Sequence, residues 1–420
     1  MKYKSVTGMR DVLPDEQSYW RLIEQKIYEI TQLYGYKRID PPILEETALF
    51  VRGVGETTDI VEKEMYTFSD KGGNSVTMRP EFTAGVLRTY LQNGLFTQAK
   101  PVKLFSIGPV FRYERPQAGR FRQHTQFNVE ALGEIDPALD VEVMSIAWQL
   151  YAELGFSGLK FQLNSTGCPK CRPNYIKKLK EYYESNYDII CNDCKRRLGK
   201  NPLRLLDCKN KTCQPVIAKA PVISDYLCEE CRDHFSGLRQ YLELSGRDYS
   251  INHKLVRGLD YYTKTVFEVW AQGIGAQNAM CGGGRYDGLI EQLGGQPTPG
   301  IGFGSGFERI ILSMKEQELA PAESKTPDIF IAHMGETAKK EAIQLTFQLR
   351  RERFSTLLAF GDRSIKSQMK EANRLNASFA VILGDREIEE RIATVKDLDE
   401  GSQTEISLDQ LVGFFNEKIL

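Results

Sequence analysis

The chain has 420 residues, which is enough for two or three domains with substantial hydrophobic cores. Its 55 Lys and Arg residues nearly balance its 56 Asp and Glu residues, so no global basic field is available to hold a nucleic acid, and any contact with RNA must be local. No stretch approaches the roughly 20 apolar residues of a membrane span, and the first residues lack an apolar signal segment, so we expect a cytoplasmic protein with no membrane partner.

The N-terminal part begins with an amphipathic helix, predicted over residues 15–34. Its apolar residues recur at steps of three and four: Trp20, Ile23, Ile27, Ile30 and Leu33. Gly35 ends this helix. Pro41 and Pro42 follow and forbid a central strand, so we expect a short strand that is bent by proline.

Two β-rich runs between residues 102 and 131 flank the turn-type segment ERPQAG and predict an antiparallel hairpin. Alternation puts five polar residues of the second strand on one face: Arg122, His124, Gln126, Asn128 and Glu130. The neighbouring arginines, Arg112, Arg115 and Arg120, are compatible with a solvated charged turn. They are also compatible with phosphate binding, because guanidinium groups hold phosphate oxygens in a bidentate manner. The polar strand face beside them favours a polar site.

Residues 165–240 form a predicted insertion module, because they hold eight of the nine cysteines together with many basic residues. Three C-x-x-C pairs and one wider pair are typical of structural zinc sites, in which closely spaced thiolates grip one tetrahedral ion. We expect up to two four-thiolate sites, and the spacing leaves open which pairs share an ion. The expected ligands are Cys168, Cys171, Cys191, Cys194, Cys208, Cys213, Cys228 and Cys231.

The sheet is expected to resume after this module, with LDYYTKTVFEVW as a strand, followed by two segments in which a strand runs into a helix. In the second of these, GIGFGSGFERI, alternate glycines leave one strand face without side chains, so that a flat ligand can approach the backbone, and Arg309 falls in the first turn of the helix. Polar residues cluster in the remaining segments: Arg257, Asp260, Tyr261, Tyr262, Arg285, Tyr286 and Asp287. Hydroxyl and carboxylate groups together can bind an imidazole, an amide or a sugar.

Beyond a polar, proline-bearing linker, strands and helices alternate, with helices predicted over residues 336–353 and 363–376. This pattern predicts a separate small α/β domain over residues 324–420 that contains some parallel sheet.

These motifs resemble those of the histidyl-tRNA synthetases, a family of class II aminoacyl-tRNA synthetases. The resemblance spans nearly the whole chain and is carried by GMRDVLP, GYKRIDPPILEE, TMRPEFTA, FRYERPQAGRFRQ, LVRGLDYYTKTVFE, GGGRYDGL and GFGSGFERI, which occur in the family's order. Among these motifs, LVRGLDYY together with GGGRYDGL is specific for histidine. The class motifs alone do not select the amino acid.

The resemblance implies an α+β fold whose catalytic domain, residues 1–323, is a class II mixed antiparallel sheet flanked by helices and interrupted by the cysteine-rich module. It implies that residues 324–420 bind the anticodon and that the protein is a homodimer. The implied enzyme is a histidine–tRNA ligase. It activates L-histidine with ATP and Mg²⁺ to histidyl-adenylate and pyrophosphate, and then transfers histidine to the 3′-terminal adenosine of tRNA(His).

The resemblance also implies roles for individual residues. The catalytic cations would be Arg112, Arg257 and Arg309. Histidine would be bound by Glu81, Thr83, Gln126, Glu130, Arg257, Tyr261, Tyr262 and Tyr286. ATP would be bound by Arg112, Glu114, Arg120, His124 and Arg309.

The sequence departs from the family pattern at three positions, where His124 replaces an aromatic residue and Phe82 and Asn128 replace glycines. A catalytically silent regulatory paralogue of ATP phosphoribosyltransferase shares this fold and is the alternative. The intact arginines and the presence of residues 324–420 count against it.

Overall fold

The computed structural model describes residues 3–55, 58, 60–116, 119–272, 279–321 and 326–419. The chain divides into two compact units, residues 1–321 and 322–420, which are described separately below. The predicted boundary between residues 323 and 324 lies outside the described residues, as do residues 117 and 118 of the predicted hairpin turn. None of the described helices is long and apolar enough to cross a membrane.

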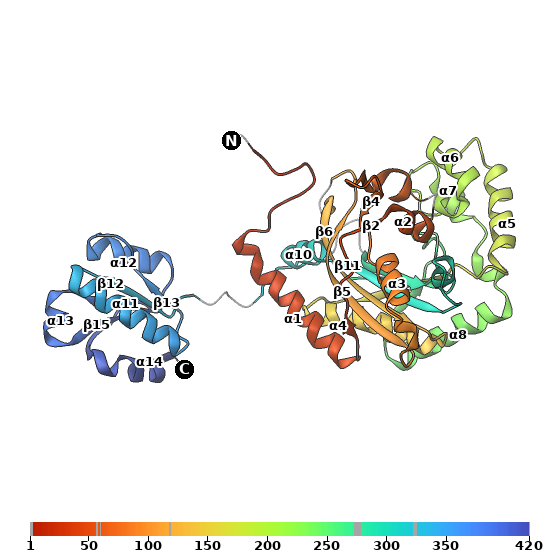
Figure 1. Ribbon diagram of the computed structural model, residues 1–420. Coiled ribbons are helices and arrows are strands. Elements are labelled where there is room, and N and C mark those ends of the chain that lie inside the picture. Colours follow the sequence, from red (N-terminus) through yellow and green to blue (C-terminus); the bar gives the residue numbers. More distant parts are fainter. Residues whose placement is uncertain are drawn as a thin grey trace. The chain divides into compact units, whose positions relative to one another are not determined.

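The first unit is built on an eight-stranded mixed sheet in the order β1-β5-β6-β11-β10-β9-β7-β8 (Figure 1). Only the outermost pairs, β1 with β5 and β7 with β8, are parallel. The strands are β1 (Lys37–Arg38), β5 (Val102–Phe111), β6 (Gln123–Leu132), β7 (Lys160–Ser165), β8 (Tyr249–Ile251), β9 (Thr263–Trp270), β10 (Ala279–Arg285) and β11 (Gly300–Gly306). The mixed sheet expected from the sequence is confirmed.

The main core lies between this sheet and four helices: α1 (Gln17–Leu33), α4 (Pro137–Glu153), α8 (Glu229–Leu244) and α10 (Phe307–Glu316). The predicted N-terminal helix is confirmed, and its residues Ile23, Ile27 and Ile30 are buried. Leu33 was expected on the same face but is 73% exposed, because it occupies the last position of the helix.

The strand β6 alternates as the sequence predicts. Phe127, Val129 and Ala131 enter the main core, whereas His124 and Gln126 face a pocket on the opposite side of the sheet. This second face is covered by α2 (Thr47–Val54), α3 (Thr83–Gln92) and α9 (Leu289–Gln292), whose apolar residues form two smaller cores. One face of the hairpin therefore stabilises the unit while the other is left for polar side chains.

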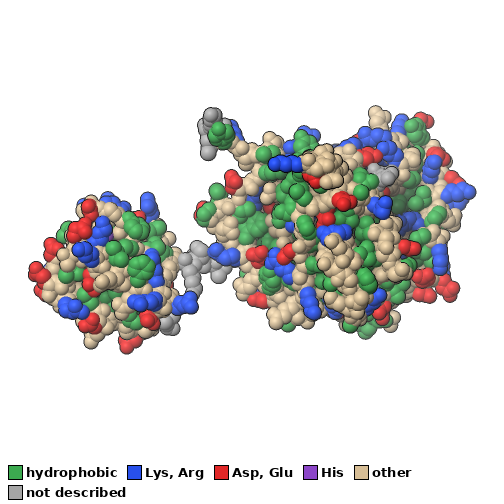
Figure 2. Space-filling model, viewed as in Figure 1, with side chains coloured by type: hydrophobic (Ala, Val, Ile, Leu, Met, Phe, Trp, Pro, Cys, Tyr) green, Lys and Arg blue, Asp and Glu red, His purple; other side chains and the backbone are tan. Residues whose placement is uncertain are grey.

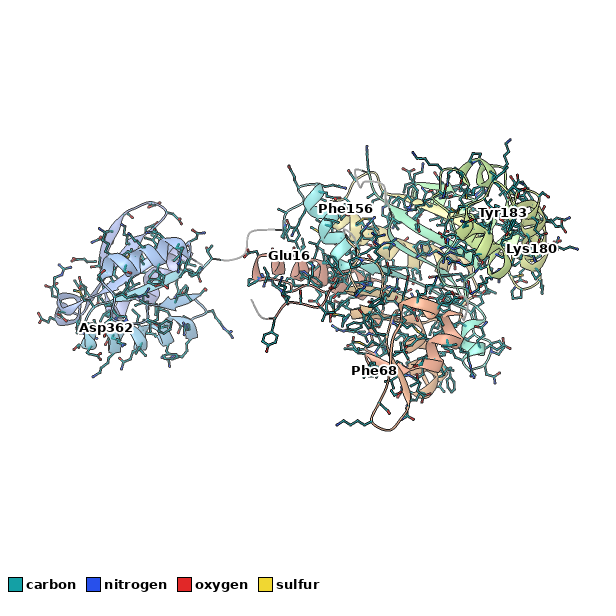
Figure 3. The ribbon with its side chains drawn as sticks, turned by 90° about the horizontal axis from the view of Figure 1, so that it is seen from above. Glu16, Phe68, Phe156, Lys180, Tyr183 and Asp362 are labelled. Carbon is teal, nitrogen blue, oxygen red and sulfur yellow. The ribbon has the colours of Figure 1, made fainter. Side chains whose placement is uncertain are left out.

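The two consecutive prolines separate two strands that belong to different sheets, so the expectation of one bent strand is wrong. β1 precedes Pro41 and joins the large sheet, whereas β2 (Leu44–Glu46) joins a three-stranded sheet with β3 (Tyr66–Ser69) and β4 (Ser75–Met78). Proline cannot donate to a strand ladder, which explains the break. The small sheet projects from the unit, with Phe68 near its outer end (Figure 3).

The cysteine-rich segment folds as a helical module with a core of its own. Its helices α5 (Arg172–Glu184), α6 (Asn192–Lys200) and α7 (Gln214–Ala218) gather on one side of the first unit, drawn in green in Figure 1. The segment then returns to the main core through α8. The module is thus an extension of the first unit.

The second unit contains a five-stranded sheet in the order β13-β12-β14-β15-β16, with apolar clusters on both faces. β12 is parallel to both β13 and β14, as the strand–helix alternation predicts. The strands are β12 (Ile329–His333), β13 (Thr356–Leu358), β14 (Phe379–Leu383), β15 (Ile392–Asp397) and β16 (Gln403–Ser407), and the helices are α11 (Glu336–Arg351), α12 (Ile365–Arg374), α13 (Asp385–Glu390) and α14 (Leu411–Ile419).

Candidate active site

A polar pocket of about 240 Å³ lies on the second face of the large sheet, over β6, β11 and β10. It brings together residues from segments that are far apart in the sequence, from Ile60 to Gly306. Nine of the predicted site residues line it: Glu81, Thr83, Arg112, His124, Gln126, Arg257, Tyr261, Tyr262 and Tyr286. Glu130, Arg309, Glu114 and Arg120 lie close to this pocket, as the contacts below establish.

Glu130 is the most deeply buried acid at the pocket floor, with 1% of its surface exposed. Its carboxyl group accepts hydrogen bonds from the Tyr286 hydroxyl and, at 2.6 Å, from Nδ2 of Asn128. Burial raises the pKa of Glu130 to about 8, although these hydrogen bonds oppose the shift. The protonated form of this carboxyl group is therefore favoured at neutral pH.

Glu81 occupies the turn that leads into α3. Its two carboxylate oxygens accept the backbone N–H groups of Thr83 and Ala84, both at 2.7 Å, and so cap the start of the helix. Burial raises the pKa of Glu81, while these hydrogen bonds and the charge of Arg112 act against the rise. The cap holds the carboxylate in one orientation at the pocket wall.

Arg257 lies flat against β10 and is paired with an acid that sequence analysis missed. Its Nη1 donates to Oε1 of Glu268 at 2.6 Å, and a Cβ on Gly282 would come within 2.3 Å of the guanidinium group. Burial opposes the charge of Arg257, but Tyr262 and Glu268 outweigh burial and raise the pKa of the guanidinium. Glu268 could have been found from the pattern, because it is the single acid in the apolar strand VFEVW.

A second group of charged residues extends from the pocket toward α10. Nε of Arg112 donates to the carbonyl of Pro80 at 2.8 Å, and burial followed by the charge of Arg112 lowers the pKa of His124 to about 3. His124 is therefore neutral. A Cβ placed on Gly306 would be 3.9 Å from Cβ of Arg309 and 4.0 Å from the His124 ring, so Arg309 stands beside His124 at the end of β11.

Two further predicted site residues, Arg120 and Glu114, lie in the same group of charged residues as Arg112 and Arg309. Nη1 of Arg120 lies 3.5 Å from Oε2 of Glu114, whose Oε1 is 3.9 Å from Nη1 of Arg112. Burial, and then the like charge of Arg120, lower the pKa of Arg309. Glu114, Arg112, Arg120 and Arg309 thus form one connected basic group in which a bound anion would relieve repulsion.

The glycines of β11 do not leave the strand face open along its whole length. A Cβ on Gly302 would lie 2.1 Å from Oε2 of Glu130, and one on Gly304 would lie 1.8 Å from Nε2 of Gln126, because these two side chains lean over the strand. Gly302, Gly304 and Gly306 all line the pocket nonetheless, so a ligand can approach the backbone between these side chains. The glycine face expected from the sequence thus borders the pocket, with Glu130 and Gln126 covering part of it.

Arg285, which the sequence analysis grouped with the site candidates, belongs to the core instead, and the half-buried Asp287 accepts from its Nη1 at 3.2 Å. Nε of the fully buried Arg285 donates to Oδ1 of Asp140 at 2.7 Å, and Asp140 in turn accepts from Thr265 and contacts His234. This network stabilises the junction of α4, α8 and the sheet. The period-2 pattern of the strand could not indicate which face would carry the arginine, because a β-bulge separates Gly284 from Arg285.

The eight cysteines of the module gather into two groups of four. The first cysteine cluster contains Cys168, Cys171, Cys228 and Cys231, and the second contains Cys191, Cys194, Cys208 and Cys213. The sulfur–sulfur distances recorded in them are 3.7 to 3.8 Å. Four sulfurs bound tetrahedrally to zinc at about 2.3 Å would be about 3.8 Å apart, whereas a disulfide requires about 2 Å. The structure thereby selects one pairing among those that the spacing left open.

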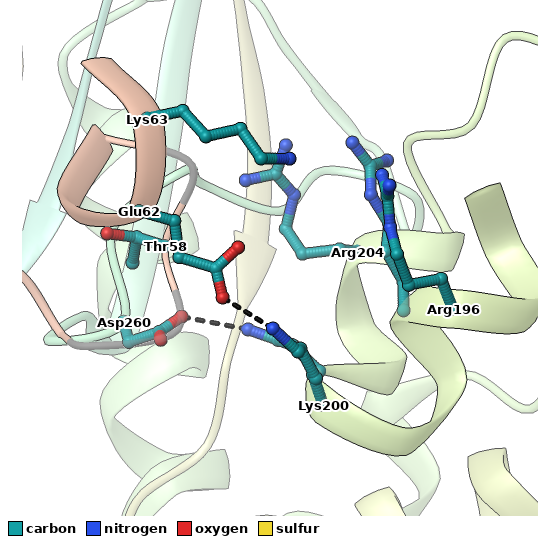
Figure 4. A pocket seen from close by; sticks show the side chains of 9 residues that line it. Thr58, Glu62, Lys63, Arg196, Lys200, Arg204 and Asp260 are labelled. Atoms are coloured by element: carbon teal, nitrogen blue, oxygen red, sulfur yellow. Dashed lines mark hydrogen bonds and ion pairs between the residues drawn. The ribbon is translucent and has the colours of Figure 1, made fainter.

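A basic hollow lies where α6 approaches the loop before β3, and Figure 4 shows its side chains. It is lined by Thr58, Glu62, Lys63, Arg196, Arg197, Lys200, Asn201, Arg204 and Asp260. Nζ of Lys200 lies 2.6 Å from Oε1 of Glu62, and Nδ2 of Asn201 donates to Oδ1 of Asp260 at 2.8 Å. The hollow adjoins the pocket, because Leu259 lines the pocket and Asp260 lines the hollow.

Comparison with known proteins gives consistent matches. The family model described as histidyl-tRNA synthetase matches residues 8–169 and 210–310, and that of an anticodon binding domain matches residues 328–418. A curated relative from Dehalococcoides mccartyi, named histidine–tRNA ligase, is 50% identical over 410 residues, which are 98% of each chain.

Solved structures agree with these matches. The apo histidyl-tRNA synthetase of S. aureus is 37% identical with a TM-score of 0.82, covering 98% of this chain and 99% of that one. A Bacillus halodurans structure described as an ATP phosphoribosyltransferase regulatory subunit/histidyl-tRNA synthetase is 22% identical with a TM-score of 0.65, covering 91% and 98%, and shares the fold.

Proposed function

The chain belongs to the histidyl-tRNA synthetase family, and we propose that its central pocket activates L-histidine with ATP to histidyl-adenylate and pyrophosphate. The histidyl group then passes to the 3′-terminal adenosine of tRNA(His). The regulatory alternative is disfavoured, because relatives about 50% identical over 98% of this chain are named as ligases. The protein is an aminoacyl-tRNA synthetase.

The observation that carries the proposal is the buried polar group at the pocket floor. Neutral imidazole has one N–H donor and one acceptor nitrogen, so it requires an acceptor and a donor at fixed positions. Glu130 and Tyr262, with Tyr286 hydrogen-bonded to Glu130, supply both kinds of group. A site built in this way discriminates strongly against analogues that leave its buried groups unpaired, by about 10⁴-fold.

The other end of the amino acid is proposed to lie between α3 and β6. Glu81 offers a fixed carboxylate for the α-amino group, and Thr83 and Gln126 complete the amino and carboxylate contacts. Oε1 of Gln126 is buried without a hydrogen-bond partner among the described residues, so a substrate ammonium group would satisfy it. Arg257 faces the substrate carboxylate and the α-phosphate. Tyr261 packs at 4.7 Å, between ring centroids, on Tyr262.

ATP is proposed to lie along the basic group from Arg112 to Arg309. Arg112 contacts the α-phosphate, Arg309 contacts the γ-phosphate and the adenine face, and Arg120 and Glu114 complete the rim beside His124. These cations stabilise the charge that develops as the histidine carboxylate attacks phosphorus and pyrophosphate leaves. Mg²⁺ would be held mainly by the phosphates, and the carboxylate of Glu114 could serve as a protein ligand. The ion would neutralise the same developing charge.

We assign structural Zn²⁺ to both cysteine clusters. The sulfur–sulfur distances fit tetrahedral coordination, and thiolates are the ligands that closed zinc sites prefer. Burial opposes ionisation of Cys168, but hydrogen bonds from backbone N–H groups and neighbouring thiols lower the pKa of this thiol to about 7. Unbridged thiols of this kind suit a reducing compartment, which supports a cytoplasmic location.

Transfer RNA is proposed to contact both units. The second unit matches the anticodon binding domain, and the basic hollow beside the pocket offers local positive charge for the acceptor end. Figure 2 shows positive and negative side chains interspersed over the visible faces, so binding depends on such local groups.

A homodimer is proposed on the basis of apolar side chains that remain exposed near β2 and β3. Ile43, Leu44 and Phe68 expose 40%, 47% and 46% of their surfaces. Exposed apolar side chains in one region are typical of a subunit interface.

The first experiment is ATP–pyrophosphate exchange by the purified, zinc-replete protein, with each of the twenty amino acids offered separately. We expect exchange with histidine alone. Exchange with a different amino acid, or none at all in protein shown to be folded, would overturn the proposed function. Absence of exchange would favour the regulatory alternative.

A further inference from the structure

The first cysteine cluster lies next to the backbone that carries Tyr262. The chain leaves β7 through Thr166 and Gly167 directly into Cys168, and these two residues pair with the start of β9. The backbone N–H of Lys264 donates to the carbonyl of Gly167 at 2.9 Å, and that of Thr166 donates to the carbonyl of Lys264 at 2.8 Å. Cys168 directly follows Gly167, and Tyr262 precedes Lys264 by two residues, so the cluster and the pocket tyrosine lie at the same end of this antiparallel strand pair.

Arg172, which follows Cys171, ties these two segments together with a single guanidinium group. Its Nε donates to the carbonyl of Thr166 at 2.8 Å, and its Nη2 donates to the carbonyl of Gly167 at 3.2 Å and to that of Tyr262. A rigid planar donor that contacts three points fixes their relative positions more firmly than separate flexible donors would.

Lys264 provides a second connection from the opposite side of the cluster. Its Nζ lies 2.9 Å from Oε1 of Glu230, which stands between Cys228 and Cys231, and its side chain is only 5% exposed. Lys264 has a φ of 49°, a left-handed conformation that is unfavourable for a residue other than glycine. Surrounding contacts must hold such a residue in place. Here they come from Glu230 beside the cluster, from the backbone of Thr166 and Gly167, and from Asp287, whose Oδ2 lies 3.6 Å from Nζ of Lys264.

The second cysteine cluster has a different setting. Its segment is joined to the rest of the first unit by contacts at the basic hollow, from Lys200 to Glu62 and from Asn201 to Asp260. These contacts end at the side chains of Glu62, in the short π-helix Ile60–Glu64, and of Asp260, in a turn, and neither side chain lines the pocket. Arg172 instead donates to the backbone carbonyl of Tyr262, which does line the pocket. The two clusters therefore provide a matched pair for experiment.

We propose that the first cysteine cluster, acting through Arg172 and Lys264, positions Tyr262 and thereby sets the affinity of the pocket for histidine. The inference rests on the proposed function. Arg172 is a positioning residue, since it donates to the carbonyl of Tyr262 and is not among the residues that line the pocket. The metal ion of this cluster consequently supports the amino-acid pocket, and the ion of the second cluster supports the module.

The first test replaces Arg172 with Met, which retains the apolar stem and removes the donors. In pyrophosphate exchange we expect the Michaelis constant for histidine to rise about tenfold, the scale of one misplaced hydrogen bond, with kcat and the Michaelis constant for ATP within about twofold. Arg172→Lys should recover part of the loss, because Lys still donates to a carbonyl.

The matched control is Arg232→Met. Arg232 follows Cys231 as Arg172 follows Cys171, but its Nη2 donates to the carbonyl of Leu227 within the module. We expect its Michaelis constant for histidine to equal that of the wild type. An unchanged constant in Arg172→Met, an equal rise for ATP, or an equal rise in Arg232→Met would overturn the proposal.

The second test compares Cys228→Ser with Cys208→Ser, two half-buried cysteines from different clusters. Each variant should lose about one zinc by elemental analysis, and only Cys228→Ser should weaken histidine binding measured by calorimetry, by about tenfold. Equal binding by both folded variants would overturn the proposal. Absence of histidine-dependent exchange in the wild type would overturn the proposed function itself, so the two failures can be distinguished.

Discussion

At the scale of single residues, burial controls the chemistry of the pocket. Glu130 and Glu81 are both nearly inaccessible to water, yet Glu81 accepts two backbone N–H groups while Glu130 accepts from side chains. Burial raises the pKa of both groups, and for Glu130 it does so to about 8. The two carboxyl groups therefore differ in their surroundings, which agrees with the different contacts proposed for them: Glu81 with the α-amino group and Glu130 with the imidazole of histidine.

The pKa of Glu130 predicts how stability depends on pH. Between about pH 4.5 and 8, Glu130 holds a proton in the folded protein that it releases in the unfolded chain, so the contribution of this group to the free energy of unfolding falls as pH rises, by about 1.4 kcal/mol per pH unit at most. In Glu130→Gln, which mimics the protonated acid, this fall should be absent.

Urea unfolding of the ligand-free protein at pH 5 to 8.5 would test this prediction. Glu24→Gln, at an exposed position of α1, serves as the control and should follow the wild type. If the free energy of unfolding changed with pH in the same way for the wild type and Glu130→Gln, Glu130 would be ionised in the folded protein and the prediction would be wrong.

Substitution of Arg112 tests whether this residue stabilises the charge that develops at the α-phosphate. In Arg112→Met we expect kcat/KM for histidine-dependent pyrophosphate exchange to fall by about 10²-fold or more, because a fixed donor to the developing charge is lost. Arg115→Met is the matched control, since Arg115 is exposed in the same turn, and should retain activity within about twofold. Equal activity of both variants would remove Arg112 from the proposed site.

At the scale of elements, β6 and β11 shape the pocket together. The register places Glu130 opposite Gly302 and Gln126 opposite Gly306, and the side chains of β6 occupy the space that glycine leaves on β11. The glycines therefore make room for the side chains of Glu130 and Gln126 and, between them, for the pocket that Gly302, Gly304 and Gly306 line. Close packing of this kind permits no added methyl group.

Gly302→Ala should consequently destabilise the first unit by about 1–3 kcal/mol and displace Glu130, because the new Cβ would lie 2.3 Å from the Val129 carbonyl oxygen. Gly288→Ala is the control, as no atom lies within 4 Å of its Cβ position. Thermal unfolding of the two variants, together with histidine-dependent exchange, measures both effects. A Gly302→Ala protein as stable and active as Gly288→Ala would contradict the packing argument.

At the scale of the whole molecule, the chain forms two units with independent cores. The pocket and both cysteine clusters belong to the first unit, whereas the second unit matches an anticodon binding domain. A substrate that contacts both units gains affinity from each contact, because the second contact is made within an existing complex.

Removal of residues 322–420 should therefore leave histidine-dependent pyrophosphate exchange within about threefold and raise the Michaelis constant for tRNA by about 100-fold or more. Exchange and aminoacylation are measured on the same preparations, and zinc content and thermal unfolding serve as controls for the integrity of the first unit. An unchanged Michaelis constant for tRNA would mean that the second unit contributes nothing to binding.

Local patterns in the sequence were sufficient to predict many of the secondary-structure elements of this protein and several of its site residues. The apolar repeat of α1, the alternation of β6 and the strand–helix order of the second unit follow from periodicities of 3.6 and 2 residues, which neighbouring residues alone determine. The motifs around Arg112, Tyr262 and Arg309 indicated the family, and the paired cysteines indicated metal sites.

Other features depend on distances between segments that are remote in the sequence, and only the tertiary structure decided them. The grouping of Cys168 with Cys228, the core position of Arg285, the pairing of Arg257 with Glu268 and the side chains that cover β11 are of this kind. Spacing along the chain limits which residues can meet, but strand register and a β-bulge choose among the possible partners.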